Sequence, residues 1–429
     1  ALDLTVKLCS SSPCLARLLV GTPGRIDALL DSLLIERLPT QAALEASLGE
    51  LCRNAVDAEP ILHAFKASQQ LRVGVRDILG RQDAESVTAA LSAIAESVVR
   101  VVVARERDRL ADRLGEPRAA DGGPAAAVVL AMGKFGGREM NDASAVVVVF
   151  LYDHDGESSP RRRGGVGTSN AHFFGELAQR TMRVFNAFGP QGRLYEMDSR
   201  LRPSGRSGPA AVSLGEFARY FAAAGPAAVW ERQALVKARP IVGPAAAVAR
   251  LEATLAAAAF DRPWTADEVA TIRRMRYRME QGARTSNLKR GPGGVVDIEF
   301  IVQVLQLVHG GREPRLRTPE TLRGLGLLHE AGHLSAERFS FLERAYRMLR
   351  AIEGRLRLLD AAARHDFPAT PEEQRKLAHL LGYAQPDLLV QDVQATTSRT
   401  RAEFERIFNE TETRLQGRGS PAGGPPLPG

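Results

Sequence analysis

The feature that most constrains the fold is a change in hydrophobic periodicity. Residues 13–115 have the three- and four-residue apolar spacing of helices, whereas 126–132 and 145–152 are short apolar runs rich in β-branched residues. A Gly- and Pro-rich stretch, 115–124, separates the two patterns. Helical spacing returns near residue 262 and continues to about residue 415. The sequence therefore predicts an α+β segment between helical ones.

These patterns predict four parts along the chain. They are a helical lead-in (1–115), an α+β domain (116–261), a helical domain (262–415) and a disordered tail (416–429). Arg193–Asp198 is a further strand candidate. Ser169 is placed to cap a helix over Asn170–Phe188, and Thr370-Pro371 marks another helix start.

Composition narrows the function classes. The chain of 429 residues is 44% hydrophobic and 25% charged, as is typical of soluble globular proteins, and it has no signal-peptide pattern, so we expect a cytoplasmic protein without a membrane partner. Three cysteines without a CxxC pattern support neither a disulfide framework nor a zinc site, and inert thiols are expected. The net charge of +7 is scattered, which disfavours nucleic acid as a partner.

A glycine-rich segment lies between the two strand candidates. Gly133–Asn141 reads GKFGGREMN, and glycines there allow backbone amides to approach a phosphate, although a glycine pair between strands is more often only a turn. Three further blocks follow: RLYEMDSRLRPSGRSG at 193–208, WERQALVKARP at 230–240 and LKRGPGGVVDIEF at 288–300. With these blocks in this order, residues 10–360 resemble the glutamine synthetase adenylyltransferase family, within the polymerase-beta-like nucleotidyltransferase superfamily.

The resemblance implies a function, cofactors and partners. It implies a polymerase-beta-like domain between helical segments, followed by a C-terminal helical bundle. The family attaches AMP from ATP to a tyrosine of glutamine synthetase with Mg²⁺ and removes it by phosphorolysis, each in one half of the protein. VVDIEF and LRPSGRSG are more similar to the attaching half; the removing half is the alternative. A PII signalling protein is a further implied partner.

The implied metal ligands are largely missing. Mg²⁺ prefers carboxylate oxygens, and an Asp-x-Asp pair on a strand presents two of them on one face. By the resemblance the pair falls at positions 145 and 147, where this sequence has Ala145 and Val147, while the third carboxylate is Asp198. Asp142 is expected to face solvent and Asp153 to lie beyond the strand, so neither replaces them. Loss of metal-dependent transfer is expected.

The implied nucleotide and phosphate contacts are intact. They are Gly136, Gly137, Lys134, Arg200, Arg202, Lys237 and Arg239. Guanidinium groups suit phosphate oxygens, although each cation alone is as readily a solvated surface residue. Ser204 and Ser207 either donate hydrogen bonds or shape a turn. The loop 289–294 is implied to close over the nucleotide, while Asp297 and Glu299 are either part of that site or acids favoured by a helix dipole.

Other residues carry less information. His172, His309 and His329 have no catalytic pattern and are expected to be packing or surface residues, and Trp230 is expected in the core. Two rival functions remain open: a docking module that holds glutamine synthetase or a PII protein without chemistry, and a nucleotidyltransferase that acts on nucleic acid. A docking module would bind without nucleotide, and a nucleic-acid enzyme would show strongly salt-dependent affinity for RNA or DNA.

Overall fold

Helices predominate in the computed structural model, whose contacts separate the chain into two units that interleave along the sequence. The structure describes residues 38–142, 144–160, 167–190, 192–359 and 365–419. The first unit takes residues up to 227, 237–258 and the segment from 351 to 364; the second takes 228–236, 259–350 and residues from 365 onward. The predicted lead-in helices and the sheet thus share one unit.

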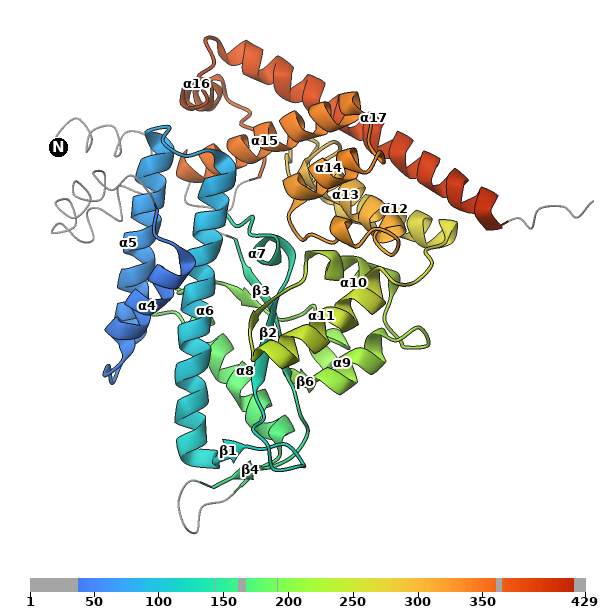
Figure 1. The fold of residues 1–429 in the computed structure, drawn as a ribbon. Coiled ribbons are helices and arrows are strands. Elements are labelled where there is room, and N and C mark those ends of the chain that lie inside the picture. The colour runs from blue at the N-terminus through green and yellow to red at the C-terminus, as the bar shows by residue number, and fades with distance from the viewer. Residues whose placement is uncertain (1–37, 143, 161–166, 191, 360–364, 420–429) are drawn as a thin grey trace, which may run out of the picture. The chain divides into compact units, whose positions relative to one another are not determined.

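Three helices open the first unit. They are α4 (Gln41–Cys52), α5 (Glu59–Ile78) and α6 (Ala84–Leu114), and α5 and α6 run side by side (Figure 1). The Asp83 side chain accepts a hydrogen bond from Ser86 N, so α6 begins where a short acidic cap precedes an apolar repeat. The part of the predicted lead-in before residue 38, including Cys9 and Cys14, lies outside the described residues; Cys52 is a buried free thiol.

Helix α6 is long and apolar enough, by length and composition, to cross a membrane. Most of its apolar window is buried within the unit, against α4, α5 and α8 (Asn170–Asn186). A core helix of a soluble protein passes the same test, so this property adds little to the expectation from sequence.

The central sheet of the first unit has five strands. They are β2 (Ala127–Ala131), β3 (Val146–Tyr152), β5 (Met197–Asp198), β6 (Ala211–Ser213) and β7 (Arg239–Val242). Their order is β5-β3-β2-β7, and β6 pairs with β3 as well. β2 is antiparallel to β3 and β7, while β5 and β6 are parallel to β3. Both predicted apolar runs are therefore strands, whereas only the end of Arg193–Asp198 is one.

One face of this sheet, the core face, packs against α6 and α8, and Val149 and Leu151 on the other face are buried as well. Val146, Val148, Phe150 and Tyr152 alternate along β3 and join a buried cluster with residues of α6 and α8. Tyr152 stacks on Phe174 of α8 with ring centroids 5.1 Å apart. Because alternate strand residues point to opposite faces, positions 145 and 147 belong to the other face.

Shorter elements complete the first unit. They are α7 (Gly133–Gly136), α9 (Leu214–Phe221), α11 (Ala245–Ala259), the 3-10 turn η1 (Gly205–Ser207), and a small sheet of β1 (Glu116–Pro117) with β4 (Ser158–Ser159). The predicted linker thus contributes a strand at β1. Ser169 Oγ accepts from His172 N at 3.3 Å, which is the expected cap of α8.

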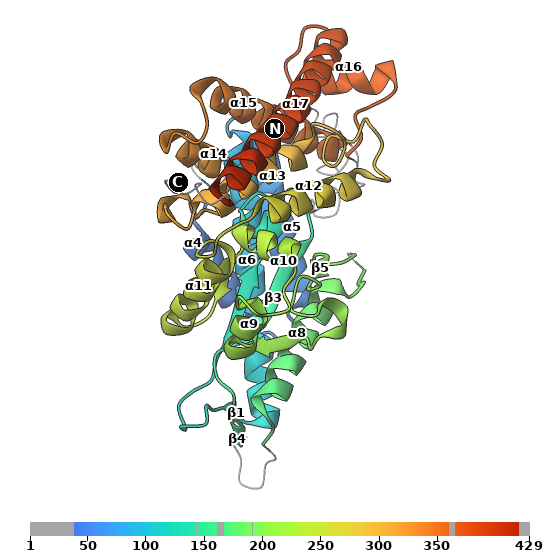
Figure 2. The same cartoon turned by 90° about the vertical axis from the view of Figure 1, so that its right-hand side faces the viewer.

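The second unit is helical throughout its described part. It contains α10 (Val229–Ala234), α12 (Ala266–Glu280), α13 (Val295–His309), η3 (Pro314–Leu316), α14 (Thr321–Glu330), most of α15 (Ala336–Leu359), α16 (Pro371–Leu380) and α17 (Pro386–Gly419); η2 (Leu235–Lys237) spans the boundary. α17 packs against α12 and α13 (Figure 2). The helix reaches Gly419, so the first residues of the predicted tail are helical, and residues 420–429 lie outside the described part.

Of two local expectations about packing, one is wrong and one is confirmed. Trp230, expected in the core, is 39% exposed at the start of α10, so that expectation is wrong. The three histidines are surface or packing residues as expected: His172 is exposed, while the His309 ring stacks on His333 and the His329 ring on Phe339.

Candidate functional site

The sequence-predicted site gathers at one end of the central sheet. Val147 is the register partner of Asp198 on β5, and Val147 O accepts a hydrogen bond from Met132 N at 2.9 Å. Met132 leads directly into α7, which contains the first glycines of GKFGG. On the far side of β2, Ala131 is the partner of Arg239. Four segments distant in sequence thus meet where β3 begins.

The two positions without carboxylates lie on the face opposite the core. Ala145 and Val147 are half-buried, while Val146 between them is fully buried in the core cluster. Register partners on neighbouring strands project to the same face, so Asp198 shares the face of Val147. An Asp-x-Asp pair at these positions would therefore point toward Asp198, as the family resemblance requires.

Asp198 is held by an arginine. Its Oδ2 accepts from Arg200 Nη2 at 2.6 Å and from Arg200 Nε at 2.9 Å, and its Oδ1 accepts from the Arg200 backbone N–H at 2.9 Å. The hydrogen bonds from Arg200 hold the pKa of Asp198 below its usual range, although partial burial opposes them. The carboxylate therefore stays ionised and is already neutralised from within the chain.

These residues do not fit Mg²⁺. The ion takes oxygen ligands in near-octahedral geometry, usually including one or two carboxylates, and a catalytic pair of ions needs more. Asp198 is the one carboxylate on this face among the three implied positions, and both of its oxygens accept from Arg200. Across the described residues, no group of three or more His, Cys, Asp or Glu side chains could hold a metal.

The glycine segment is built for close backbone approach. A Cβ added to Gly136 would lie 1.8 Å from Lys237 O and 2.8 Å from Ala131 O, so no side chain fits there. Gly133 has a φ of +56°, a left-handed conformation that glycine adopts without strain. The need for glycine at 136 thus comes from packing against the residues before β7.

Each cation implied by the resemblance near this segment has a carboxylate partner. Lys134 Nζ lies 3.0 Å from both carboxylate oxygens of Glu353, and Lys237 Nζ donates to Glu139. Arg239 Nη2 lies 2.7 Å from Glu96 Oε2 on α6.

Arg239 lies on a different face from Asp198. Ala131 is the partner of both Arg239 and Val148, so the Arg239 side chain projects to the core face, and its Nε donates to Gly136 O at 3.0 Å. Arg239 and Asp198 are therefore not brought to one face. The hydrogen bond from Arg239 to Gly136 O stabilises the glycine turn.

Arg202 holds the loop that follows β5. Its Nη1 donates to Ser199 O at 2.9 Å and to Ser199 Oγ at 3.1 Å, and its Nη2 donates to Gly208 O at 3.2 Å. Burial lowers the pKa of Arg202, with Asp198 opposing the shift. Ser199 thus accepts hydrogen bonds from Arg202 in this loop. Ser204 has a left-handed φ of +60° directly before the η1 turn, so its backbone shapes this turn.

The expectation that Asp142 faces solvent is wrong. It is half-buried, and its Oδ1 accepts from Gln70 Nε2 at 3.4 Å. Burial raises its pKa to about 6; repulsion from Asp77 adds to the shift, while Arg357 and Lys66 oppose it. Asp153, beyond β3 as expected, accepts from Ala126 N at 2.7 Å and so ties the start of β2.

The raised pKa of Asp142 predicts that its substitution increases the free energy of unfolding in a pH-dependent way. A carboxyl whose pKa rises on folding destabilises the folded state once it ionises, so its contribution is favourable below about pH 4 and is lost as pH rises through about 6. Asp142→Asn is expected to raise the free energy of unfolding by about 1–2 kcal/mol at pH 8 and by almost nothing at pH 4. Urea unfolding at both pH values measures the difference, and an equal effect at the two would contradict it.

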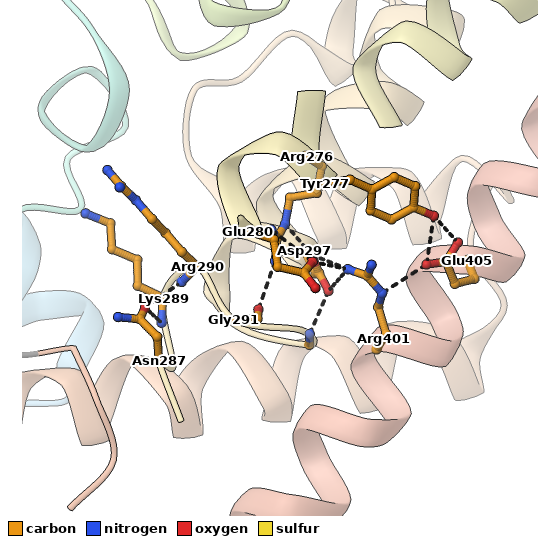
Figure 3. A network of polar contacts seen from close by, with 11 residues as sticks. Arg276, Tyr277, Glu280, Asn287, Lys289, Arg290, Gly291, Asp297, Arg401 and Glu405 are labelled. Atoms are coloured by element: carbon orange, nitrogen blue, oxygen red, sulfur yellow. Dashed lines mark hydrogen bonds and ion pairs between the residues drawn. The ribbon is translucent and has the colours of Figure 1, made fainter. Parts of the chain in front are cut away.

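The glycine loop before α13 is fixed by a buried ionic network (Figure 3). Asp297 and Arg276 are both fully buried, with Arg276 Nε 2.5 Å from Asp297 Oδ1. Asp297 Oδ2 accepts from Gly293 N at 2.7 Å, and Arg276 Nη2 donates to Gly291 O at 2.8 Å. Arg401 of α17 adds an ion pair of 3.2 Å to the same carboxylate.

Asp297 is thus an acid in the first turn of α13, and its partners give it a structural role. Figure 3 shows Lys289 and Arg290 extending away from this network, with their backbone N–H groups donating to Asn287 Oδ1 at 3.2 and 2.8 Å. Glu299 is half-buried on α13.

Sequence reasoning missed the carboxylates that pair with the cations. Glu96 is an acid within the apolar run 91–103 of α6, and this is a signal in the sequence because a carboxylate is rarely buried without a partner. Glu139 lies within GKFGGREMN itself. Glu353, by contrast, is 219 residues from Lys134, and no local pattern marks it.

Comparison with known proteins shows which family the chain belongs to. The family model described as Glutamate-ammonia ligase adenylyltransferase matches residues 2–254, more than half of the chain. The chain belongs to this family. A second model, GlnD PII-uridylyltransferase, matches residues 268–411. The adenylyltransferase match covers the whole described sheet, and the second match covers the helices of the second unit from α12.

Curated relatives carry the same family name. Proteins named bifunctional glutamine synthetase adenylyltransferase/adenylyl-removing enzyme are 33% identical in Burkholderia pseudomallei over 86% of this chain and 42% of the relative. The counterpart in Aromatoleum aromaticum is 31% identical over 94% and 41%, and that in Nitrosococcus oceani 33% over 81% and 36%. The chain thus spans about two fifths of the length of these relatives.

Proposed function

We propose that this chain is derived from the half of the adenylyltransferase that attaches AMP to glutamine synthetase, and that it has lost Mg²⁺-dependent transfer. The observation that carries the proposal is the register of β3 with β5. Positions 145 and 147 lie on the face of Asp198, where carboxylates would bind metal, and Ala145 and Val147 have no oxygen to offer.

The role of Mg²⁺ in the reaction explains why the absence of carboxylates at positions 145 and 147 would be enough to abolish transfer. Mg²⁺ bound at such a site neutralises charge on the phosphates and the departing pyrophosphate and makes the attacking tyrosine hydroxyl more acidic. The residues that remain here orient one another: Arg200 pairs with Asp198, and Lys237 pairs with Glu139. A polymerase-beta-like fold for the sheet and ATP as the nucleotide belong to the same proposal.

The test is transfer of labelled AMP from ATP to glutamine synthetase with Mg²⁺. We expect label from the unsubstituted chain to stay at background and the Ala145→Asp, Val147→Asp chain to exceed it by at least about 100-fold, since removing one transition-state contact costs ~10²–10³ in rate. Lys376→Ala, which breaks an exposed ion pair with Glu372, is the matched control and should behave as the unsubstituted chain. Equal incorporation by the unsubstituted chain and the chain with both aspartates would contradict the proposal.

A second candidate is a docking module that holds glutamine synthetase or a PII protein without chemistry. The internal pairing of Lys134, Arg200, Lys237 and Arg239 with carboxylates favours it, because these cations are already neutralised without nucleotide. A pull-down of glutamine synthetase with and without ATP separates the two candidates. Capture that does not depend on ATP supports docking, and capture that requires ATP supports a nucleotide site.

A further inference from the structure

The end of helix α15 contacts the glycine segment through one ion pair. Lys134, the second residue of GKFGG, lies with its Nζ 3.0 Å from both Oε1 and Oε2 of Glu353. The side chain of Glu353 is 3% exposed and that of Lys134 14% exposed, so solvent screens the pair little. Both residues belong to the first unit, which takes up α15 from Ala351.

The place of Lys134 makes this pair relevant to ligand binding. Lys134 follows Met132 by two residues, and the backbone N–H of Met132 donates to the carbonyl of Val147 at the candidate site. A lysine at this place could meet a phosphate group at the end of the sheet. While the ammonium is bound by both oxygens of Glu353, its charge is directed toward α15 instead.

Glu353 also has a second cation within reach. Arg357, one helical turn later, has its Nη2 4.0 Å from Glu353 Oε1, and its side chain is 5% exposed. Residues four apart lie on the same helix face, so Arg357 already shares this carboxylate with Lys134. The carboxylate would therefore not be left unpaired if Lys134 turned to another anion.

We propose that Glu353 is an internal competitor for phosphate: it occupies Lys134 and releases it to the phosphate groups of a nucleotide when the carboxylate shifts to Arg357. This inference rests on the proposed function, because it takes the end of the sheet to be a nucleotide site. It adds a specific regulatory contact, namely the pair between α7 and the C-terminal turns of α15, which sets how tightly nucleotide binds.

The direct test is ATP affinity measured by calorimetry on the full chain in EDTA, so that metal plays no part. Glu353→Gln keeps the side-chain shape and removes the competing charge, and we expect it to tighten ATP binding about 5- to 20-fold, within the usual range of coupling between two sites. Glu343→Gln on the same helix breaks a half-exposed pair with Arg347 and is the matched control; it should change affinity by less than about twofold.

Combining Glu353→Gln with Lys134→Ala tests whether the gain in ATP affinity depends on Lys134. In a Lys134→Ala chain, adding Glu353→Gln should change ATP affinity by less than about twofold, since the released cation is gone. A gain that persists in that background overturns the proposal, as does an unchanged or weaker affinity of Glu353→Gln alone. If Glu353→Gln does not fold, Glu353→Asp, which retracts the charge by one methylene, should give a smaller gain in the same direction, and no gain overturns it.

The outcome is independent of the transfer assay. If the chain with Asp at 145 and 147 transfers AMP but Glu353→Gln binds ATP no better, the competition fails and the proposed function stands. If the chain with both aspartates transfers nothing, the proposed function fails whatever Glu353→Gln does to ATP affinity.

Discussion

Replacing Asp297 with alanine is expected to destabilise the second unit by about 3–5 kcal/mol, because removing one partner of a buried ion pair leaves the other charge uncompensated. Asp297 and Arg276 are both fully buried at 2.5 Å, and Asp297 also holds Gly293 N and Arg401. The substitution would leave Arg276 without its closest carboxylate and the loop before α13 without its anchor. Hydrogen exchange in α12, α13 and α17 measures the loss.

The matched control is an acid in an exposed pair. Glu372 is 70% exposed and pairs with Lys376 one turn away on α16, so Glu372→Ala should leave the free energy of unfolding almost unchanged. Asp297→Asn keeps the volume and one acceptor oxygen and should fall between the two. An Asp297→Ala chain within about 1 kcal/mol of the unsubstituted chain would mean that the network contributes little to the fold.

The second large effect is expected at Gly136. Gly136→Ala should destabilise the first unit by at least about 3 kcal/mol, at the upper end of what overpacking costs, because its Cβ would lie 1.8 Å from Lys237 O and 2.8 Å from Ala131 O. Both atoms are backbone, and Ala131 lies in β2. Relief of the clash therefore requires the segment before β7 to move away from the sheet.

A glycine in open space provides the comparison. Gly175 lies within α8, and a Cβ there would meet nothing within 4 Å, so Gly175→Ala should stabilise the unit by about 0.5–1 kcal/mol. Urea unfolding followed by hydrogen exchange of the backbone amides of β2 and β3 reports on this unit. If Gly136→Ala unfolds at the same urea concentration as the unsubstituted chain, the packing of the glycine segment is not what requires glycine.

Much of the local structure was predictable because its causes are local. The β-branched runs form β2 and β3, and Asp83 and Ser169 cap α6 and α8 through hydrogen bonds to residues three positions on. It was not predictable that only the last two residues of Arg193–Asp198 form a strand. Its pairing with β3 extends over Met197 and Asp198 alone, and strand length depends on the partner.

The exposure of single residues depended on distant packing. Asp142 is half-buried beside Gln70 of α5, and Trp230 is exposed at the start of α10, each against expectation. Neither outcome has a signal in the neighbouring sequence, because burial is determined by segments that are far away along the chain.

The sequence by itself determined the absence of carboxylates at 145 and 147, since side-chain chemistry follows from residue type wherever the strand lies. Only the tertiary structure decided how Lys134 and Arg239 are neutralised. Glu353 reaches Lys134 from 219 residues away, and Glu96 reaches Arg239 from α6 on the core face of the sheet. The physical reason is that an ion pair forms by distance in space and by loss of solvent screening, and the order of residues along the chain specifies neither.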